Sequence, residues 1–66
     1  MFAKVVQKRG AKTPNGYEGR YELRMGRKGT GKLIAAVNYW PWSGKSVEEA
    51  ERTIAFEAKR AGVELI

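Results

Sequence analysis

The one stretch with the residue types and spacing of a chemical motif lies at residues 26–32. Gly26, Gly31 and Lys32 fit the first part of the phosphate-binding pattern G-x-x-x-x-G-K, but Leu33 stands where that pattern needs a metal-binding Ser or Thr. Such a loop must also open a helix, whereas the alternating apolar residues that follow are typical of a strand. We therefore interpret residues 26–32 as a Gly-rich hairpin loop that presents basic side chains to a phosphate backbone.

Other catalytic chemistry is limited by composition. The sequence has no Cys and no His, which removes disulfides, Cys/His zinc sites, thiol catalysis and imidazole acid–base chemistry. We expect a non-enzymatic protein without a metal site or cofactor. Residues 1–66 form one domain with a thin core. No apolar run suits a membrane span or a signal peptide, so we expect the protein in the cytoplasm, with no membrane partner.

The positive charge is unevenly distributed along the chain. The formal net charge is +6, with ten Lys/Arg and two Glu in residues 1–45 but three Lys/Arg and five Glu in residues 46–66. A polarised basic surface is typical of proteins that bind nucleic acid. The alternative is that the charge only keeps a small protein soluble.

Hydrophobic periodicity predicts three strands, at residues 2–8, 17–25 and 32–40. The first has poor alternation and suits an edge strand. The second alternates strictly between apolar and charged residues, after a turn at Pro14-Asn15-Gly16. The third is apolar at both odd and even positions, which favours a central place with some cover on its second face.

A helix is predicted at residues 46–61. Ser46 and Glu49 have the spacing of a capping box, and Gly62 suits the position just after the last turn. One narrow stripe faces the sheet and consists of Val47, Ala50, Ile54, Ala58 and Ala61. The expected fold is thus α+β, a three-stranded antiparallel sheet packed on one C-terminal α-helix (βββα). Residues 63–66 add either a short fourth strand or a packed tail.

Basic residues of the strands and loops are the candidate nucleic-acid contacts. Glu18 and Glu22 alternate with Arg on the charged face of the second strand, which either weakens phosphate binding there or serves base reading, since Arg can pair with guanine and Glu with cytosine. A solvated face of ion pairs is the equally weighted alternative. An exposed Trp could stack on a base, and of Trp40 and Trp42 we expect one in the core. The candidate set is Lys8, Arg9, Lys12, Arg20, Arg24, Arg27, Lys28, Lys32 and Trp42.

Helix periodicity places Phe56 nearly opposite the apolar stripe, one turn from Arg52 on one side and from Arg60 on the other. An exposed ridge of this composition indicates a protein-interaction surface or a homodimer contact. The alternative is that Phe56 tucks under the C-terminal segment.

In element order the chain resembles the small three-stranded DNA-binding domains of tyrosine integrases (arm-type N-terminal domains) and of plant ethylene-response factors. The matching points are Asn15-Gly16-Tyr17, Gly31-Lys32 and residues 46–50. In those families the sheet enters the major groove, so the resemblance implies DNA-facing roles for Arg20, Arg24, Arg27 and Lys28. A resemblance to double-stranded-RNA-binding domains at residues 44–46 is weaker.

These observations predict a small basic module that binds nucleic acid, with duplex DNA favoured, through the strand face and the basic hairpin loop. The alternative is a phage- or mobile-element-type protein that binds a host protein and inhibits or adapts it. The sequence leaves open DNA against RNA, base preference, oligomeric state and pathway.

Overall fold

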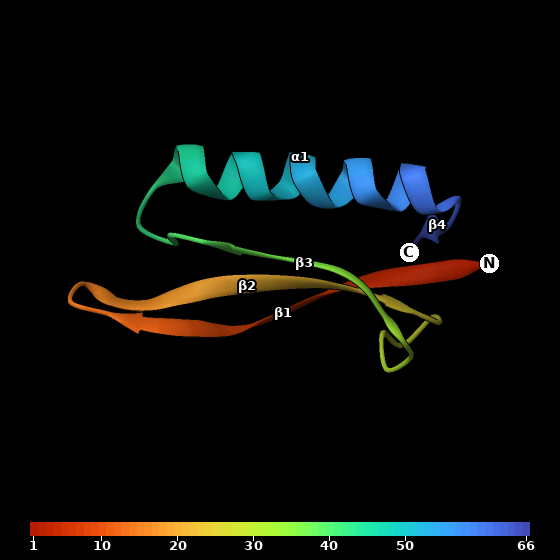
Figure 1. Ribbon diagram of the computed structural model, residues 1–66, viewed down its shortest axis with the longest axis horizontal. Helices are drawn as coiled ribbons and strands as arrows, with labels where there is room; N and C mark the ends of the chain where they lie inside the picture. Colours follow the sequence, from red (N-terminus) through yellow and green to blue (C-terminus); the bar gives the residue numbers. More distant parts are fainter.

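The fold is α+β, as the periodicity predicts, and consists of one sheet and one helix. The computed structural model describes all 66 residues. Its elements are β1 (Phe2–Thr13), β2 (Gly16–Met25), β3 (Leu33–Tyr39), α1 (Gly44–Ala61) and β4 (Glu64–Leu65). The sheet order is β3-β2-β1-β4, with β1–β2 and β2–β3 antiparallel and β4 parallel to β1. Helix α1 runs along one face and leaves the other face uncovered (Figure 1).

Two predictions about strand position are wrong. β3 lies at the edge of the sheet, and β1 lies inside it, between β2 and β4. The apolar character of β3 on both sides has a local cause, because the β2–β3 register shifts so that Ile34 is skipped between the pairs Leu23–Ala35 and Arg24–Leu33. This bulge lets Ile34 pack against the core, while Leu33 is exposed. The second face of β3 then holds Leu33, which is exposed, and the small or polar Ala36 and Asn38.

Strand β1 extends beyond the predicted end at Lys8 and pairs with β2 as far as Thr13. A register shift between Arg9 and Lys12 accommodates Gly10 and Ala11. The turn at residues 14–15 then closes the ribbon, and the Thr13 hydroxyl donates to the Gly16 carbonyl at 2.7 Å. The basic segment between the first predicted strand and the turn is therefore part of a long β-hairpin.

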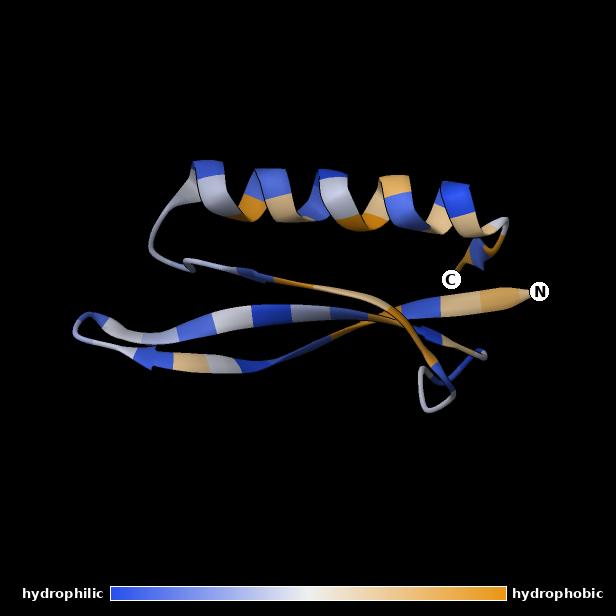
Figure 2. Ribbon diagram, viewed as in Figure 1, coloured by the Kyte–Doolittle hydropathy of each residue, from blue (hydrophilic) through white to orange (hydrophobic).

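The core lies between α1 and the sheet. Ala3, Leu23, Ile54 and Ala58 form its buried cluster, and Leu23 is the only large side chain that is fully buried. The apolar side of the helix faces the strands in Figure 2. Of the predicted stripe, Ala50, Ile54 and Ala58 are buried, Val47 is half-buried and Ala61 is exposed. A core this thin makes each of its few large side chains important for stability.

The helix begins two residues before the predicted start, and the predicted capping box is wrong. Ser43 is the N-cap, and its hydroxyl accepts from the Ser46 backbone N–H at 3.4 Å. The Ser46 hydroxyl instead accepts from the Trp40 backbone N–H at 2.9 Å, which ties the helix to the end of β3. Glu48 and Glu49 thus lie beyond the first turn, which has no acidic residue.

The predicted stop at Gly62 is confirmed. Gly62 has a φ of 71°, and its N–H donates to the Ala58 and Lys59 carbonyls. The chain then reverses, and residues 64–65 pair with the start of β1, which confirms the short fourth strand.

The expectation of one Trp in the core is also wrong, since Trp40 is 53% and Trp42 47% exposed. Tyr39 closes that end of the core instead. Its ring covers Gly19, where any side chain would collide with it, and stacks on Tyr21 with 4.4 Å between ring centroids. Phe56 is not tucked under the C-terminal segment either, because 62% of it is exposed.

Candidate nucleic-acid interface

The candidate site is the sheet face that α1 leaves uncovered, which we call the open face. Even-numbered residues of β1 and β2 share it, because Lys4 pairs with Arg24, Val6 with Glu22 and Lys8 with Arg20. Odd-numbered residues such as Ala3 and Leu23 point to the helix side and are buried there. The open face comprises Lys4, Val6, Lys8, Glu18, Arg20, Glu22, Arg24, Leu33, Ala36, Asn38 and the loop residues 26–31.

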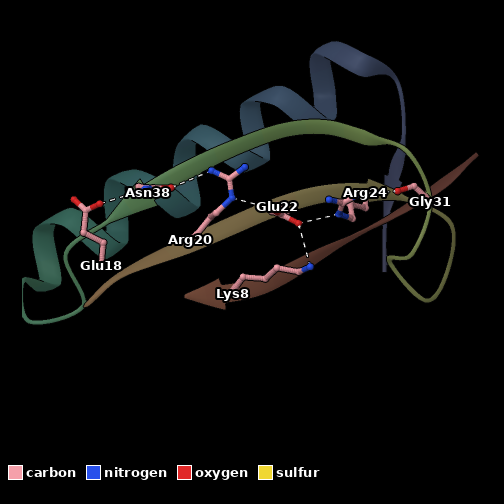
Figure 3. A network of polar contacts seen from close by, with 7 residues as sticks. All are labelled: Lys8, Glu18, Arg20, Glu22, Arg24, Gly31 and Asn38. Atoms are coloured by element: carbon pink, nitrogen blue, oxygen red, sulfur yellow. Dashed lines mark hydrogen bonds and ion pairs between the residues drawn. The ribbon is translucent and has the colours of Figure 1, made fainter. Parts of the chain in front are cut away.

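Glu22 is the centre of a cation cluster on the open face (Figure 3). Its carboxylate accepts from Arg20 Nε at 2.9 Å and from Arg24 Nε at 2.8 Å, and Lys8 Nζ lies 3.7 Å away. The side chain is 8% exposed. The hydrogen bonds from Arg20 and Arg24 lower the pKa of Glu22 to about 2, against an opposing contribution from burial. Glu22 is thus an anion at any physiological pH and holds both guanidinium groups in place.

The polar contacts continue along the sheet in both directions. Arg20 Nη1 donates to Asn38 Oδ1 at 3.2 Å, and Asn38 Nδ2 donates to Glu18 Oε1 at 3.2 Å. At the other end, Arg24 Nη1 donates to the Gly31 carbonyl at 3.0 Å. Nη2 of both arginines makes no hydrogen bond within the chain and remains a free donor. Each arginine is therefore fixed on one side and available on the other, as a preorganised phosphate or base contact needs.

The loop 26–32 folds back over the open face instead of extending as a flexible tip. The Gly26 N–H donates to the Phe2 carbonyl at 2.8 Å, and the Gly31 N–H donates to the Met25 carbonyl at 3.0 Å. Gly29 is buried against Val6, with a φ of 71°. A Cβ on Gly29 would lie 2.5 Å from Val6 Cγ2, so only glycine fits this contact. The loop leads into β3 and not into a helix, which agrees with the rejection of a nucleotide-binding loop.

Folding of the loop creates a basic hollow of about 470 Å³ on the open face. Lys8 comes from β1, Arg24 from β2 and Lys28 from the loop, and Thr30 adds a hydroxyl. Cations from three segments thus converge on one space. An anion of phosphate size is the ligand that this chemistry favours.

The predicted contact residues do not all lie together. Lys8, Arg20, Arg24 and Lys28 meet on the open face, and Arg27 lies over the Phe2 ring at 4.0 Å. Lys32 is exposed where the loop ends. Three other predicted residues are away from this face. Arg9 and Lys12 lie beside Tyr17, an odd-numbered residue of β2 on the helix side: Arg9 stacks on its ring at 4.6 Å, and Lys12 pairs with it in the ladder. Trp42 lies outside the sheet, in the connection between β3 and α1.

The sequence interpretation missed Lys4, Thr30, Asn38 and Trp40 as members of the interface or its polar contacts. Lys4 could have been found, because Phe2, Lys4, Val6 and Lys8 share one parity with the open face. Asn38 and Thr30 carry no such signal, since their place depends on strand pairing and on the fold of the loop.

The two acidic residues do not neutralise the open face. Lys4, Lys8, Arg20, Arg24, Arg27 and Lys28 face only Glu18 and Glu22, which leaves a formal charge of +4. Glu22 is enclosed by its partners, and both carboxylate oxygens of Glu18 accept hydrogen bonds, from Asn38 and from Trp40 Nε1. The glutamates therefore position cations and an indole more than they present acid to solvent.

The fold contains no group of three His, Cys, Asp or Glu side chains that could hold a metal ion. No helix has the length and apolar character needed to cross a membrane. Comparisons of the chain with protein-family models, curated proteins and solved structures give no significant match.

Proposed function

We propose that this chain is a non-enzymatic module that binds duplex DNA through its open face. The observation that carries the proposal is the convergence of six Lys and Arg residues on the one sheet face that has no helix over it. Two of them, Arg20 and Arg24, are held by Glu22 with free donors left over. Phosphate contacts of this kind supply most of the affinity of a DNA-binding surface.

The shape of the molecule supports a duplex as the partner. Its extents are 39 × 21 × 14 Å, and its long axis runs along the β1–β2 hairpin (Figure 1). The B-DNA major groove is about 12 Å wide and admits a two-stranded β-ribbon. The resemblance to integrase arm-type and ethylene-response-factor domains implies the same use of a sheet. We place this activity in the cytoplasm, as part of the proposal.

Fluorescence anisotropy with a random-sequence duplex and a single strand of equal length tests the function. We expect binding to the duplex at about 50 mM salt that weakens linearly in log–log form as salt rises. The absence of duplex binding at tens of micromolar protein under these conditions would refute the proposal.

A second candidate function, binding and inhibiting or adapting a host protein, has one observation in its favour. Phe56 is 62% exposed on the outer side of α1, where Arg52 and Arg60 are occupied by ion pairs with Glu48 and Glu57. An exposed aromatic ring among neutralised charges is a feature of protein interfaces. The same residue could join two copies of the chain.

Nuclease treatment separates these readings. In a pull-down from nuclease-treated lysate, one protein retained by the wild type but not by Phe56→Ser would favour the second candidate. Light scattering provides the check for a dimer, and a monomeric mass at high concentration would count against it.

A further inference from the structure

A second hollow lies apart from the basic one, between residues of the β1–β2 hairpin end and of the β3–α1 connection. Both segments lie at the same end of the molecule (Figure 1). Trp40, Trp42, Thr13 and Asn15 line its space of about 250 Å³. Two aromatic side chains and a polar rim thus share one small site. Its volume is below the range of about 300–1,000 Å³ for pockets that hold drug-sized ligands, which suits a single planar ring system.

Trp40 is fixed in place by contacts that do not bury it. Its indole Nε1 donates to Glu18 Oε2 at 3.2 Å, and its backbone N–H donates to the Ser46 hydroxyl. The Trp40 carbonyl accepts from the Ser43 N–H at 3.0 Å, which holds the segment with Trp42 in a turn. Trp side chains are usually highly buried. A positioned but exposed indole therefore points to a ligand that stacks on it.

The hollow is the end point of the polar network on the open face. Glu18 holds the Trp40 indole with one oxygen and Asn38 with the other, and Asn38 binds Arg20. The network thus connects Arg20 on the open face with the Trp40 side of the hollow. The Asn15 carboxamide makes no hydrogen bond within the chain and can donate to or accept from the edge of a base.

We propose that the hollow binds one unpaired base where a duplex ends in a single strand. This inference rests on the proposed function and deepens it, because it makes a junction of duplex and single strand the preferred ligand. Stacking on aromatic side chains recognises bases without regard to sequence. A base pair inside a helix is covered on both faces and a terminal pair on one, so only an unpaired base has both faces free to enter the hollow.

Anisotropy with three matched DNAs tests the inference: a blunt duplex, and the same duplex with a four-nucleotide 5′ or 3′ overhang. We expect one overhang to bind about tenfold more tightly than the blunt duplex, within the range for stacking of one base. Trp42→Ala should remove this gain and leave blunt-duplex affinity within about twofold. Trp42→Phe should retain part of it, and Phe56→Ala serves as the matched aromatic control on α1.

A fluorescence measurement keeps the test independent of variant folding. With 2-aminopurine as the first unpaired base, wild-type protein should quench its emission by stacking. Equal affinity for all three DNAs, or a gain that survives Trp42→Ala, would overturn the inference while blunt-duplex binding still supports the proposed function. Saturable binding of a proline-rich peptide to the tryptophans, with no overhang preference, would also overturn it. If the wild-type protein does not bind the blunt duplex at all, the proposed function itself is refuted.

Discussion

Glu22 shows how a single acidic residue can serve a basic surface. Its position inside the sheet face lets it bond Arg20 and Arg24 on either side along the same strand. Unpaired arginines would repel one another and move freely, whereas these two are fixed by a shared anion. The carboxylate therefore organises the positive face and lowers its charge by only one.

The pKa of Glu22 gives a prediction for pH dependence. Folding lowers this pKa from its ordinary 4.5 to about 2, so its contribution to stability is fully present above pH 4.5 and disappears as pH falls through 2. Glu22→Gln should lower the urea midpoint at pH 7, because it removes the charge that both arginines share. The difference between the two proteins should narrow between pH 4.5 and 2. A difference that stays constant over this interval would contradict the assignment.

Gly29 provides a second prediction at this scale. Gly29→Ala should destabilise the protein by about 1–3 kcal/mol, because the residue has a left-handed backbone and its new methyl group would press on Val6. The control is Gly44→Ala, which has open space and no positive φ, with an expected change within about 0.5 kcal/mol. Urea unfolding measures both, and equal effects would mean that the loop does not pack on the sheet as described.

At the scale of elements, helix α1 is a scaffold for the sheet, and its two sides should differ in tolerance. Ile54→Ala should cost about 2–5 kcal/mol, because Ile54 is 3% exposed and is one of few large core residues. Phe56→Ala, two residues further on, should change stability by less than about 0.5 kcal/mol. Thermal unfolding by circular dichroism checks both. A large loss from Phe56→Ala would show that its ring is covered, by a second copy or otherwise.

Local sequence chemistry was sufficient to predict most helices and strands, but not which strands lie next to one another in the sheet. The strict alternation of residues 17–25 and the stripe around Ile54 predicted β2 and α1, and Gly62 marked the helix end. Strand order was mispredicted because a strand's own pattern reports burial and not pairing. The Ile34 bulge made an edge strand look buried on both sides.

The prediction of the helix start failed for a related reason. Ser43 and Ser46 are both acceptable N-cap residues. Ser43 is the one used, because the Ser46 hydroxyl accepts a hydrogen bond from the Trp40 backbone N–H. Likewise, Tyr39 and not a tryptophan fills the end of the core, because its ring fits into the space above Gly19. Contacts between segments decide such cases, and a single sequence does not display them.

Prediction of the candidate site was partial in the same way. Arg20 and Arg24 followed from alternation, and Lys28 from the composition of its loop. Arg9 and Lys12 were separated from them by the parity of β1 and its register shift. The folding of the loop over Val6, which brings Lys28 to Lys8, had no signal beyond the glycines.

For the whole molecule, the charge asymmetry of the sequence becomes an asymmetry between two layers. The basic residues of the first two-thirds of the chain supply the sheet, with a net +4 on its open face, while residues 46–66 carry three Lys/Arg and five Glu on and after the helix. A nucleic-acid duplex should therefore bind one side only. The helix side, with its ion pairs and Phe56, is left for other contacts.

The most direct test of this account compares two variants that lose equal charge from opposite layers. Lys4→Gln with Lys28→Gln alters the open face, and Arg52→Gln with Lys59→Gln alters the helix. Salt-dependent anisotropy with a blunt duplex should show that the first pair lowers affinity at least about tenfold and reduces the log–log salt slope by about 2, since each lost phosphate contact removes about one. The helix pair should stay within about twofold of the wild type. Equal losses from both pairs, or a loss from the helix pair alone, would contradict the claim that the open face is the DNA-binding surface.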